Sequence, residues 1–346
     1  MKHIFMKLVP VFLLFGLISS CKNQDWSFPD YKYSTTYFPY QSPVRTLVLG
    51  NYDLADNTKD NNLQFSIGIT MGGVYENTKD IKIGYVLDEA LARNLYTDKG
   101  DTLVALPQAY YTLSPTGTVT IPKGEFQGYI DVQLTEAFLN DPRSCQVRYV
   151  VPLKLTSADN DSILQGKPAV PNPDPRVASD WVYSPKNFTL FGIKYINPYH
   201  GKYLLRGKDV VKDGTGAMVD QVVYHSKYVE DNAIWHLKTI SRTQVEVTGM
   251  VRKTSGSLGN FQMIMTFSDD GNCTLTQTKG TTFPITGTGK FVKNADEWGG
   301  KKRDAIYLSY QITDTSLRET HHVNDTLVIR DRDVRLETFN PVVKQD

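Results

Sequence analysis

Short segments of alternating apolar and polar residues, separated by turn residues, run through almost the whole chain and limit it to β-structure. In residues 63–70, Leu63, Phe65, Ile67 and Ile69 fall on one face, and polar residues lie largely opposite. This period of two is that of a half-buried strand. The connections are rich in Gly, Pro, Asp and Asn, which are typical of hairpin turns. The sequence contains no βαβ alternation and no heptad pattern, so we expect an all-β protein.

The 346 residues are enough for about two domains, and a proline-rich stretch divides them. We expect an immunoglobulin-like antiparallel sandwich at residues 36–166, because its strands follow one another closely through Pro and Gly turns. Residues 167–198 contain six prolines and are predicted to form a linker, with residues 184–195 as a candidate for pairing with one of the sheets. About eight consecutive strands in residues 199–346 favour a lipocalin-like antiparallel barrel, and a second sandwich is the alternative.

Residues 1–20 are predicted to be a secretory signal. A basic start precedes an apolar run over residues 8–18, which is too short to span a bilayer comfortably. Two serines and then Cys21 follow this run, which is the layout of a bacterial lipobox. We therefore expect cleavage before Cys21, acylation of its thiol and a tether over residues 21–35. The acyl chains would hold the protein in the outer membrane, on the cell-surface face rather than the periplasmic face. An ordinary signal peptide is the alternative.

Charge and motifs argue against several functional classes. The chain carries 38 Lys and Arg residues against 37 Asp and Glu residues, whereas a nucleic-acid-binding protein would show a basic stripe. The sequence contains no dinucleotide-binding glycine motif, no P-loop, no zincin motif and no Gly-x-Ser-x-Gly motif. We therefore expect no cofactor and no catalytic activity. A hydrolase with dispersed carboxylates is the alternative, because paired acids come together only in the fold.

The cysteines and histidines predict no metal site. Once Cys21 is acylated, only Cys145 and Cys273 are left, and they are expected to be separate buried thiols, with a disulfide between them as the alternative. His321 and His322 would point to opposite faces of a strand, so they cannot easily chelate one ion; we expect them at the edge of a loop.

Trp298 is the first candidate for contact with a ligand. It stands in the polar stretch of residues 294–303, where we expect a loop, with Asp296 and Arg303 as hydrogen-bonding neighbours. Sugar rings present flat apolar faces that stack on Trp or Tyr, and their hydroxyls bind nearby polar groups. The two glycines after Trp298 would let a ligand approach the backbone closely. Packing of the indole beneath the loop is the alternative.

Two further aromatic residues, Trp181 and Tyr183, lie beside the predicted linker, where two domains could form a cleft. They are therefore candidate ligand contacts as well. Trp235 lies inside a regular alternating strand pattern and is expected in the core instead.

Three features together resemble the uncharacterised two-domain surface lipoproteins of Bacteroidetes. They are the lipobox at Cys21, residues 110–114 leading through 119–124 to 150–153, and the closing residues 325–332. In those proteins a sandwich of the type found ahead of endo-β-N-acetylglucosaminidases is followed by a lipocalin-like β-domain of unknown function. The resemblance implies that the protein acts together with glycan-utilisation systems. It supplies no catalytic residue, because the acidic Asp-x-x-Asp-x-Asp-x-Glu strand of the catalytic relatives is absent.

These observations predict a non-catalytic, lipid-anchored protein that binds or presents a glycan or glycoprotein, in company with an outer-membrane transport complex. A structural or assembly subunit, such as an adhesin-like spacer, is the alternative. Exposed aromatic side chains on one face would favour binding, and one large apolar patch would favour assembly.

Overall fold

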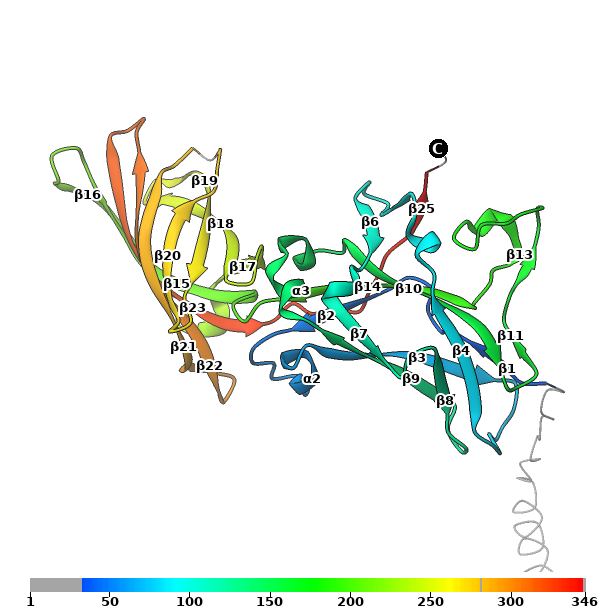
Figure 1. The fold of residues 1–346 in the computed structure, drawn as a ribbon. Helices are drawn as coiled ribbons and strands as arrows, with labels where there is room; N and C mark the ends of the chain where they lie inside the picture. Colours follow the sequence, from blue (N-terminus) through cyan, green and yellow to red (C-terminus); the bar gives the residue numbers. More distant parts are fainter. Residues whose placement is uncertain (1–32, 281, 345–346) are drawn as a thin grey trace, which may run out of the picture.

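The two halves of the chain form two β-structured units that lie side by side (Figure 1). The computed structural model describes residues 33–280 and 282–344. The predicted signal segment, Cys21 and most of the tether lie outside the described residues. The prediction of an all-β protein is confirmed, as is that of a sandwich followed by a barrel. Within the described residues, no helix has the length and apolar character needed to cross a membrane.

The first unit is a sandwich of two sheets. One sheet has the strand order β11 (Ser162–Ile163), β1 (Thr35–Tyr37), β3 (Gln64–Gly72), β9 (Gln127–Leu134), β7 (Tyr111–Ser114). The other has the order β24 (Glu337–Thr338), β2 (Pro43–Val48), β14 (Phe188–Ile196), β10 (Tyr149–Ala158), β6 (Thr102–Ala105), β5 (Leu95–Tyr96), β25 (Val342–Val343), with β4 (Ile81–Leu87) paired to β10 and β8 (Thr118–Ile121) to β4.

Most strand pairs of the sandwich are antiparallel, as expected, but three are parallel. These are β1 with β11, β2 with β14 and β6 with β10. Parallel strands need a long crossover, and each of these pairs is joined by a long connection. These connections carry short helices: α2 (Thr58–Asn61), α3 (Glu136–Asn140) and 3₁₀ turns at Glu89–Ala92, Gln108–Tyr110, Pro142–Cys145 and Ala178–Asp180. A further 3₁₀ turn, Val229–Asp231, lies in the second unit.

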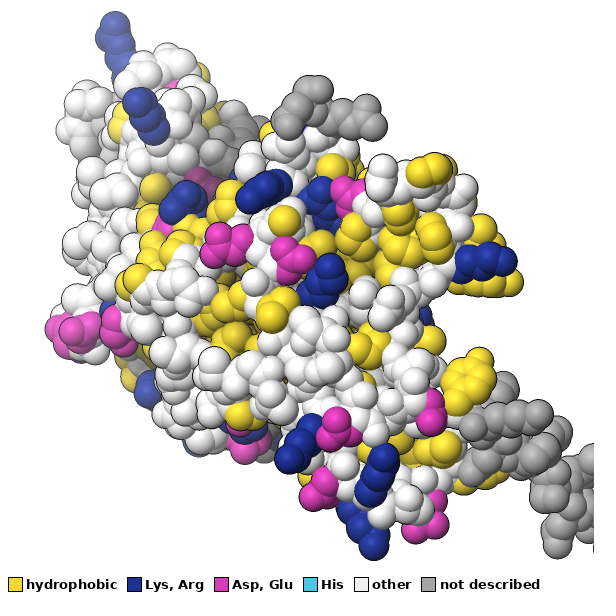
Figure 2. Space-filling model, turned by 45° about the vertical axis from the view of Figure 1, so that its right-hand side comes forward, with side chains coloured by type: hydrophobic (Ala, Val, Ile, Leu, Met, Phe, Trp, Pro, Cys, Tyr) yellow, Lys and Arg dark blue, Asp and Glu magenta, His cyan; other side chains and the backbone are white. Residues whose placement is uncertain are grey.

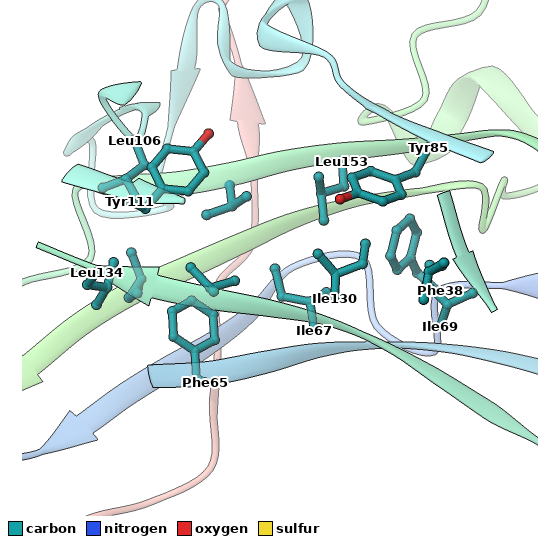
Figure 3. Close-up of a cluster of buried hydrophobic side chains, with 14 of the residues drawn as sticks. Phe38, Phe65, Ile67, Ile69, Tyr85, Leu106, Tyr111, Ile130, Leu134 and Leu153 are labelled. Atoms are coloured by element: carbon teal, nitrogen blue, oxygen red, sulfur yellow. The ribbon is translucent and has the colours of Figure 1, made fainter. Parts of the chain in front are cut away.

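A buried apolar layer lies between the two sheets (Figure 3). Phe65, Ile67 and Ile69 of β3 face Leu153 of β10 across this layer, as their alternation predicts. Fully burying one such side chain contributes about 1.5–3 kcal/mol. A second apolar cluster lies on the other face of the β10–β14 sheet, beneath Leu91 and other residues of the connections and the C-terminal segment.

The strand β14 confirms the predicted pairing of residues 184–195 with a sheet and shortens the predicted linker of residues 167–198. It lies inside that range, yet it pairs with both β2 and β10 in the middle of a sheet. The sheet is covered on both faces, so Phe188, Leu190 and Ile193 are all buried. The proline-rich part carries only the two-stranded flap of β12 (Lys167–Pro168) and β13 (Trp181–Tyr183). The chain therefore crosses between the units at residues 197–200, and its last strands, β24 and β25, return to the first unit.

The second unit is a closed antiparallel barrel rather than a second sandwich. Eight strands form its wall: β15 (Gly201–Lys212), β17 (Ala233–Thr239), β18 (Gln244–Lys253), β19 (Gly256–Phe267), β20 (Asn272–Gln277), β21 (Ile285–Trp298), β22 (Lys301–Asp314), β23 (Glu319–Asp331). Pairing of β15 with β23 closes the barrel, and β16 (Met218–Tyr224) extends outward on β15. Apolar side chains fill the interior, and Trp235 is among them, as expected.

The structure tests the predictions made for the paired histidines and for the cysteines. His321 lies inside β23, fully buried, and its Nδ1 lies 2.8 Å from a carboxylate oxygen of Asp209. Its neighbour His322 lies on the opposite face of the strand, as the strand period predicts. The prediction that the two histidines lie at the edge of a loop is wrong, because both lie within β23. Among the described cysteines, Cys145 and Cys273 are both free thiols.

Candidate functional site

Trp298 lies at the end of a tight hairpin, not in a loop. Strands β21 and β22 pair up to Trp298 and Lys301, and Gly299 and Gly300 form the two-residue turn between them. Both glycines have positive φ, 61° and 69°, which a type I′ hairpin requires. No atom lies within 4 Å of a Cβ built on either glycine, so the turn geometry accounts for both. The predicted loop is therefore wrong for these residues.

The indole of Trp298 is held in place from two sides. Its Nε1 donates a hydrogen bond of 2.9 Å to the backbone oxygen of Ile329 on β23. The guanidinium carbon of Arg303 lies 4.4 Å from the centre of the ring, a cation–π distance. The side chain of Trp298 is only partly buried, and it lines a cavity.

A cavity of about 200 Å³ opens beside this ring, where the first unit meets the end of the barrel. Residues of both units line it: Asn51, Tyr52, Asp53 and Leu54 from the segment after β2, and Pro198, Tyr203, Trp298, Arg303, Asp304, Ile329, Arg330, Asp331 and Arg332 from the crossing and the barrel. Its wall therefore combines the indole and Tyr52 with charged groups of both signs, while the buried ring of Tyr203 lies behind them in the barrel core, and this suits a polar ligand that has apolar faces.

An ion pair joins the two units at the cavity wall. The Nη1 of Arg303 donates to the carboxylate of Asp53 at 3.0 Å. The Nε of the same guanidinium is buried and has no hydrogen-bond partner among the described residues. Asp296, the cross-strand neighbour of Arg303, does not line the cavity, because its carboxylate pairs with Arg206 instead.

At the cavity wall, the guanidinium of Arg332 connects the two units. It donates hydrogen bonds to the backbone oxygens of Leu49 and Asn51 in the first unit. It also donates to those of Asn197 and His200 in the crossing segment. Burial lowers the pKa of this guanidinium, since it has left water without a hydrogen-bonded carboxylate partner. These hydrogen bonds hold the two units together at the cavity.

The three carboxylates of the cavity are each held by another group. Asp53 pairs with Arg303, Asp304 accepts the backbone N–H of Asn294, and Asp331 accepts that of Asp333. Among the described residues, no group of three or more His, Cys, Asp or Glu side chains is arranged to hold a metal ion.

The structure does not bring all the predicted site residues together. Trp298 and Arg303 line one cavity, whereas Trp181 and Tyr183 lie in the flap strand β13 at the far end of the first unit (Figure 1). The indole Nε1 of Trp181 donates to the backbone oxygen of Asp174, and Tyr183 is 70% exposed. The cleft expected beside the linker is therefore not formed by these two residues.

The sequence did not predict that residues of the first unit would line the cavity. Tyr52, Asp53 and Leu54 stand in an irregular segment between strands, and Asp53 meets Arg303 across 250 residues of chain. No motif links residues so far apart, and their meeting depends on how the two units dock.

The fold and the cavity define a class: two-unit all-β proteins in which a sandwich and an eight-stranded barrel share a small polar–aromatic cavity at their junction. Residues 31–162 match a family described as an N-terminal domain, and residues 198–333 match a domain of unknown function, DUF5627. No curated protein matches the chain.

A crystal structure of a Bacteroides ovatus protein of unknown function, determined at 2.40 Å, is similar over nearly the whole chain. It has 36% sequence identity and a TM-score of 0.83, and the match covers 91% of this chain and 100% of that one. The chain therefore belongs to the same family as that protein, with the N-terminal domain followed by the domain of unknown function. A second Bacteroides ovatus structure of unknown function matches with 15% identity and a TM-score of 0.43, over 88% of this chain and 100% of that one.

Proposed function

We propose that this protein is a lipid-anchored glycan-binding protein of the outer membrane, and that the cavity at the junction of its two units receives the glycan. The observation that carries the proposal is the partly exposed indole of Trp298, fixed beside Arg303 and lining a small cavity with Tyr52 and Tyr203. An aromatic wall stacks against the apolar face of a sugar ring, and the charged rim offers hydrogen bonds to its hydroxyls.

The size and the chemistry of the cavity support capture rather than catalysis. Its volume is below the roughly 300–1,000 Å³ of common small-molecule pockets, so it suits one sugar unit at the end or side of a glycan. Each of its carboxylates is engaged by another group, as described above, which favours a binding role over the alternative of a hydrolase. The resemblance to domains that precede endo-β-N-acetylglucosaminidases supports a place in a glycan-utilisation system.

Replacing Trp298 by alanine is expected to weaken glycan binding about tenfold, a loss of roughly 1.4 kcal/mol. The indole supplies the apolar wall of the cavity, and alanine cannot stack against a sugar ring. The measurement is a glycan array probed with labelled protein of residues 22–346, followed by titration of the glycans that bind.

Trp181→Ala is the matched control, because it removes an indole that lies outside the cavity. It should leave binding of the same glycans unchanged. If Trp298→Ala retains full affinity while its melting temperature falls, the indole only plugs the end of the barrel, and the proposal is wrong.

The lipid anchor rests on Cys21, which follows the apolar run and two serines. Replacing Cys21 by alanine is expected to abolish acylation and to release the protein from the membrane, because acyl chains on this residue are the proposed anchor. Detergent-phase partitioning of the wild type and the variant measures this. Equal partitioning of both proteins into the detergent phase would contradict the lipoprotein assignment.

The alternative of a structural or assembly subunit is favoured by a different observation. Apolar side chains are exposed on the first unit, among them Val182 and Tyr183 of the flap and Leu336 before β24. In Figure 2 hydrophobic side chains reach the surface between interspersed Lys, Arg, Asp and Glu side chains. Such a surface is typical of contact with another protein, for example a part of an outer-membrane transport complex.

A further inference from the structure

The outer face of the β3–β9 sheet carries two tyrosine rings that lie across glycines. In the register of the sheet, Tyr129 of β9 stands opposite Gly68 of β3. A Cβ built on Gly68 would lie 3.6 Å from the ring of Tyr129, and one on Gly72 would lie 3.5 Å from the hydroxyl of Tyr37. The ring of Tyr129 therefore occupies space over β3 that a side chain at residue 68 would otherwise fill, and the tip of the Tyr37 ring reaches Gly72 from its place opposite Thr70.

The two rings are spaced along one strand. Gly68 and Gly72 are four residues apart in β3, which corresponds to roughly 13 Å. Tyr129 is 51% exposed, and Tyr37 is partly exposed with the ammonium group of Lys186 5.5 Å from the centre of its ring. A ligand that touches both rings would run along β3 between these two glycines, so we expect a chain of sugars rather than a single one.

Around the rings the face is built from amide and hydroxyl groups. The outward residues of β3, β9 and β7 besides the glycines and Tyr129 are Gln64, Ser66, Thr70, Gln127, Asp131, Gln133, Thr112 and Ser114. Asp131 is the single carboxylate in that set, and it accepts a hydrogen bond from Ser66. Several of these residues, together with Lys59, line a shallow depression of about 340 Å³ over β3, β7 and β9, next to but not including Tyr129. Amides both donate and accept, which matches sugar hydroxyls rather than ions.

We propose that this face is a second binding surface, which takes an extended, uncharged glycan chain. The tyrosine rings stack on sugar faces at two points, and the glutamines and hydroxyls bind the sugars between and beside them. The surface shares no residue with the cavity around Trp298. Its existence therefore does not depend on the function proposed for that cavity.

The test is electrophoresis of the purified full-length protein, in detergent, through native gels that contain starch, galactomannan, α-mannan or xylan. We expect at least one of these neutral polysaccharides to retard the wild type. Tyr129→Ala should weaken that retardation tenfold or more, whereas Tyr129→Phe, which keeps the ring, should stay within about threefold of the wild type. A gel that contains polygalacturonate reports binding of a charged chain.

Tyr228→Ala is the matched control, because it removes a tyrosine that is 54% exposed in the second unit. Neither this variant nor Trp298→Ala should change the retardation. An unchanged Trp298→Ala protein would show that the polysaccharide binds the face around Tyr129 and not the cavity around Trp298. The proposal is overturned if no neutral polysaccharide retards the wild type, or if only polygalacturonate does. It is also overturned if Tyr129→Ala migrates like the wild type, or loses only thermal stability, since the ring would then merely pack on Gly68.

Discussion

Replacing Arg332 by alanine is expected to lower the free energy of unfolding by about 3–5 kcal/mol, close to the largest effect of a single substitution. The residue is only 6% exposed, and its guanidinium donates to the backbone oxygens of Leu49, Asn51, Asn197 and His200. A hydrogen bond to a charged group contributes about 1.5–3 kcal/mol. Alanine removes all four at once, and water that enters the space replaces them only in part.

Urea denaturation followed by tryptophan fluorescence measures this loss. Arg335→Ala is the matched control, because its side chain is 74% exposed and contacts only Asp333 among the described ion pairs, so it should change stability by less than about 0.5 kcal/mol. Arg332→Lys should fall between the two, since an ammonium group cannot reach four oxygens from one position. A loss below about 1 kcal/mol for Arg332→Ala would show that the junction does not depend on this residue.

The fold was largely predictable because strand periodicity and turn chemistry are local. The alternation at Phe65, Ile67 and Ile69 places these side chains in the core, and a regular series of strands predicts the barrel. The linker was predicted to be too long, and the pairing of residues 184–195 was only a candidate, because their pattern lacks the alternation of a half-buried strand. Residues 188–196 are apolar on both faces because two separate cores cover them, and that pattern does not alternate.

The candidate site was predictable only where it lies within one hairpin. Trp298 and Arg303 are near neighbours in the sequence, and the register of β21 and β22 places them on one part of the barrel. Asp53 and Arg332 join them through docking of the two units, and no local pattern reports that contact. The prediction that Asp296 contacts the ligand was wrong, because its carboxylate pairs with Arg206, which lies 90 residues earlier in the chain.

A buried carboxylate inside the barrel predicts an unusual pH dependence of stability. Asp325 lies among apolar side chains of the interior, where it accepts hydrogen bonds from the hydroxyls of Tyr224 and Tyr310. Burial raises its pKa to about 6, although the two tyrosine hydroxyls and the nearby Arg252 favour the charged form; the carboxylate of Asp209 acts in the same direction as burial. In the unfolded chain the same group has a pKa of about 3.9.

Between pH 4 and pH 6 the folded protein therefore binds more protons at Asp325 than the unfolded chain does. Its contribution to stability is fully present below about pH 4 and is lost as the pH rises through 6, by about 2–3 kcal/mol. Asp325→Asn cannot ionise, so the stability of the wild type relative to this variant should fall by that amount between pH 4 and pH 7. Urea denaturation of both proteins across this range measures the difference.

Asp213→Asn provides the opposite case. Asp213 is partly exposed in a turn, where hydrogen bonds from Thr215 lower its pKa, so its contribution to stability is lost only as the pH falls. Its difference from the wild type should stay flat between pH 5 and pH 7. If the curve for Asp325→Asn runs parallel to the wild type over that interval as well, the carboxylate keeps an ordinary pKa, and water must reach it inside the barrel. If the curves diverge as expected, the carboxylate of Asp325 is desolvated in the folded barrel and its pKa is raised to about 6.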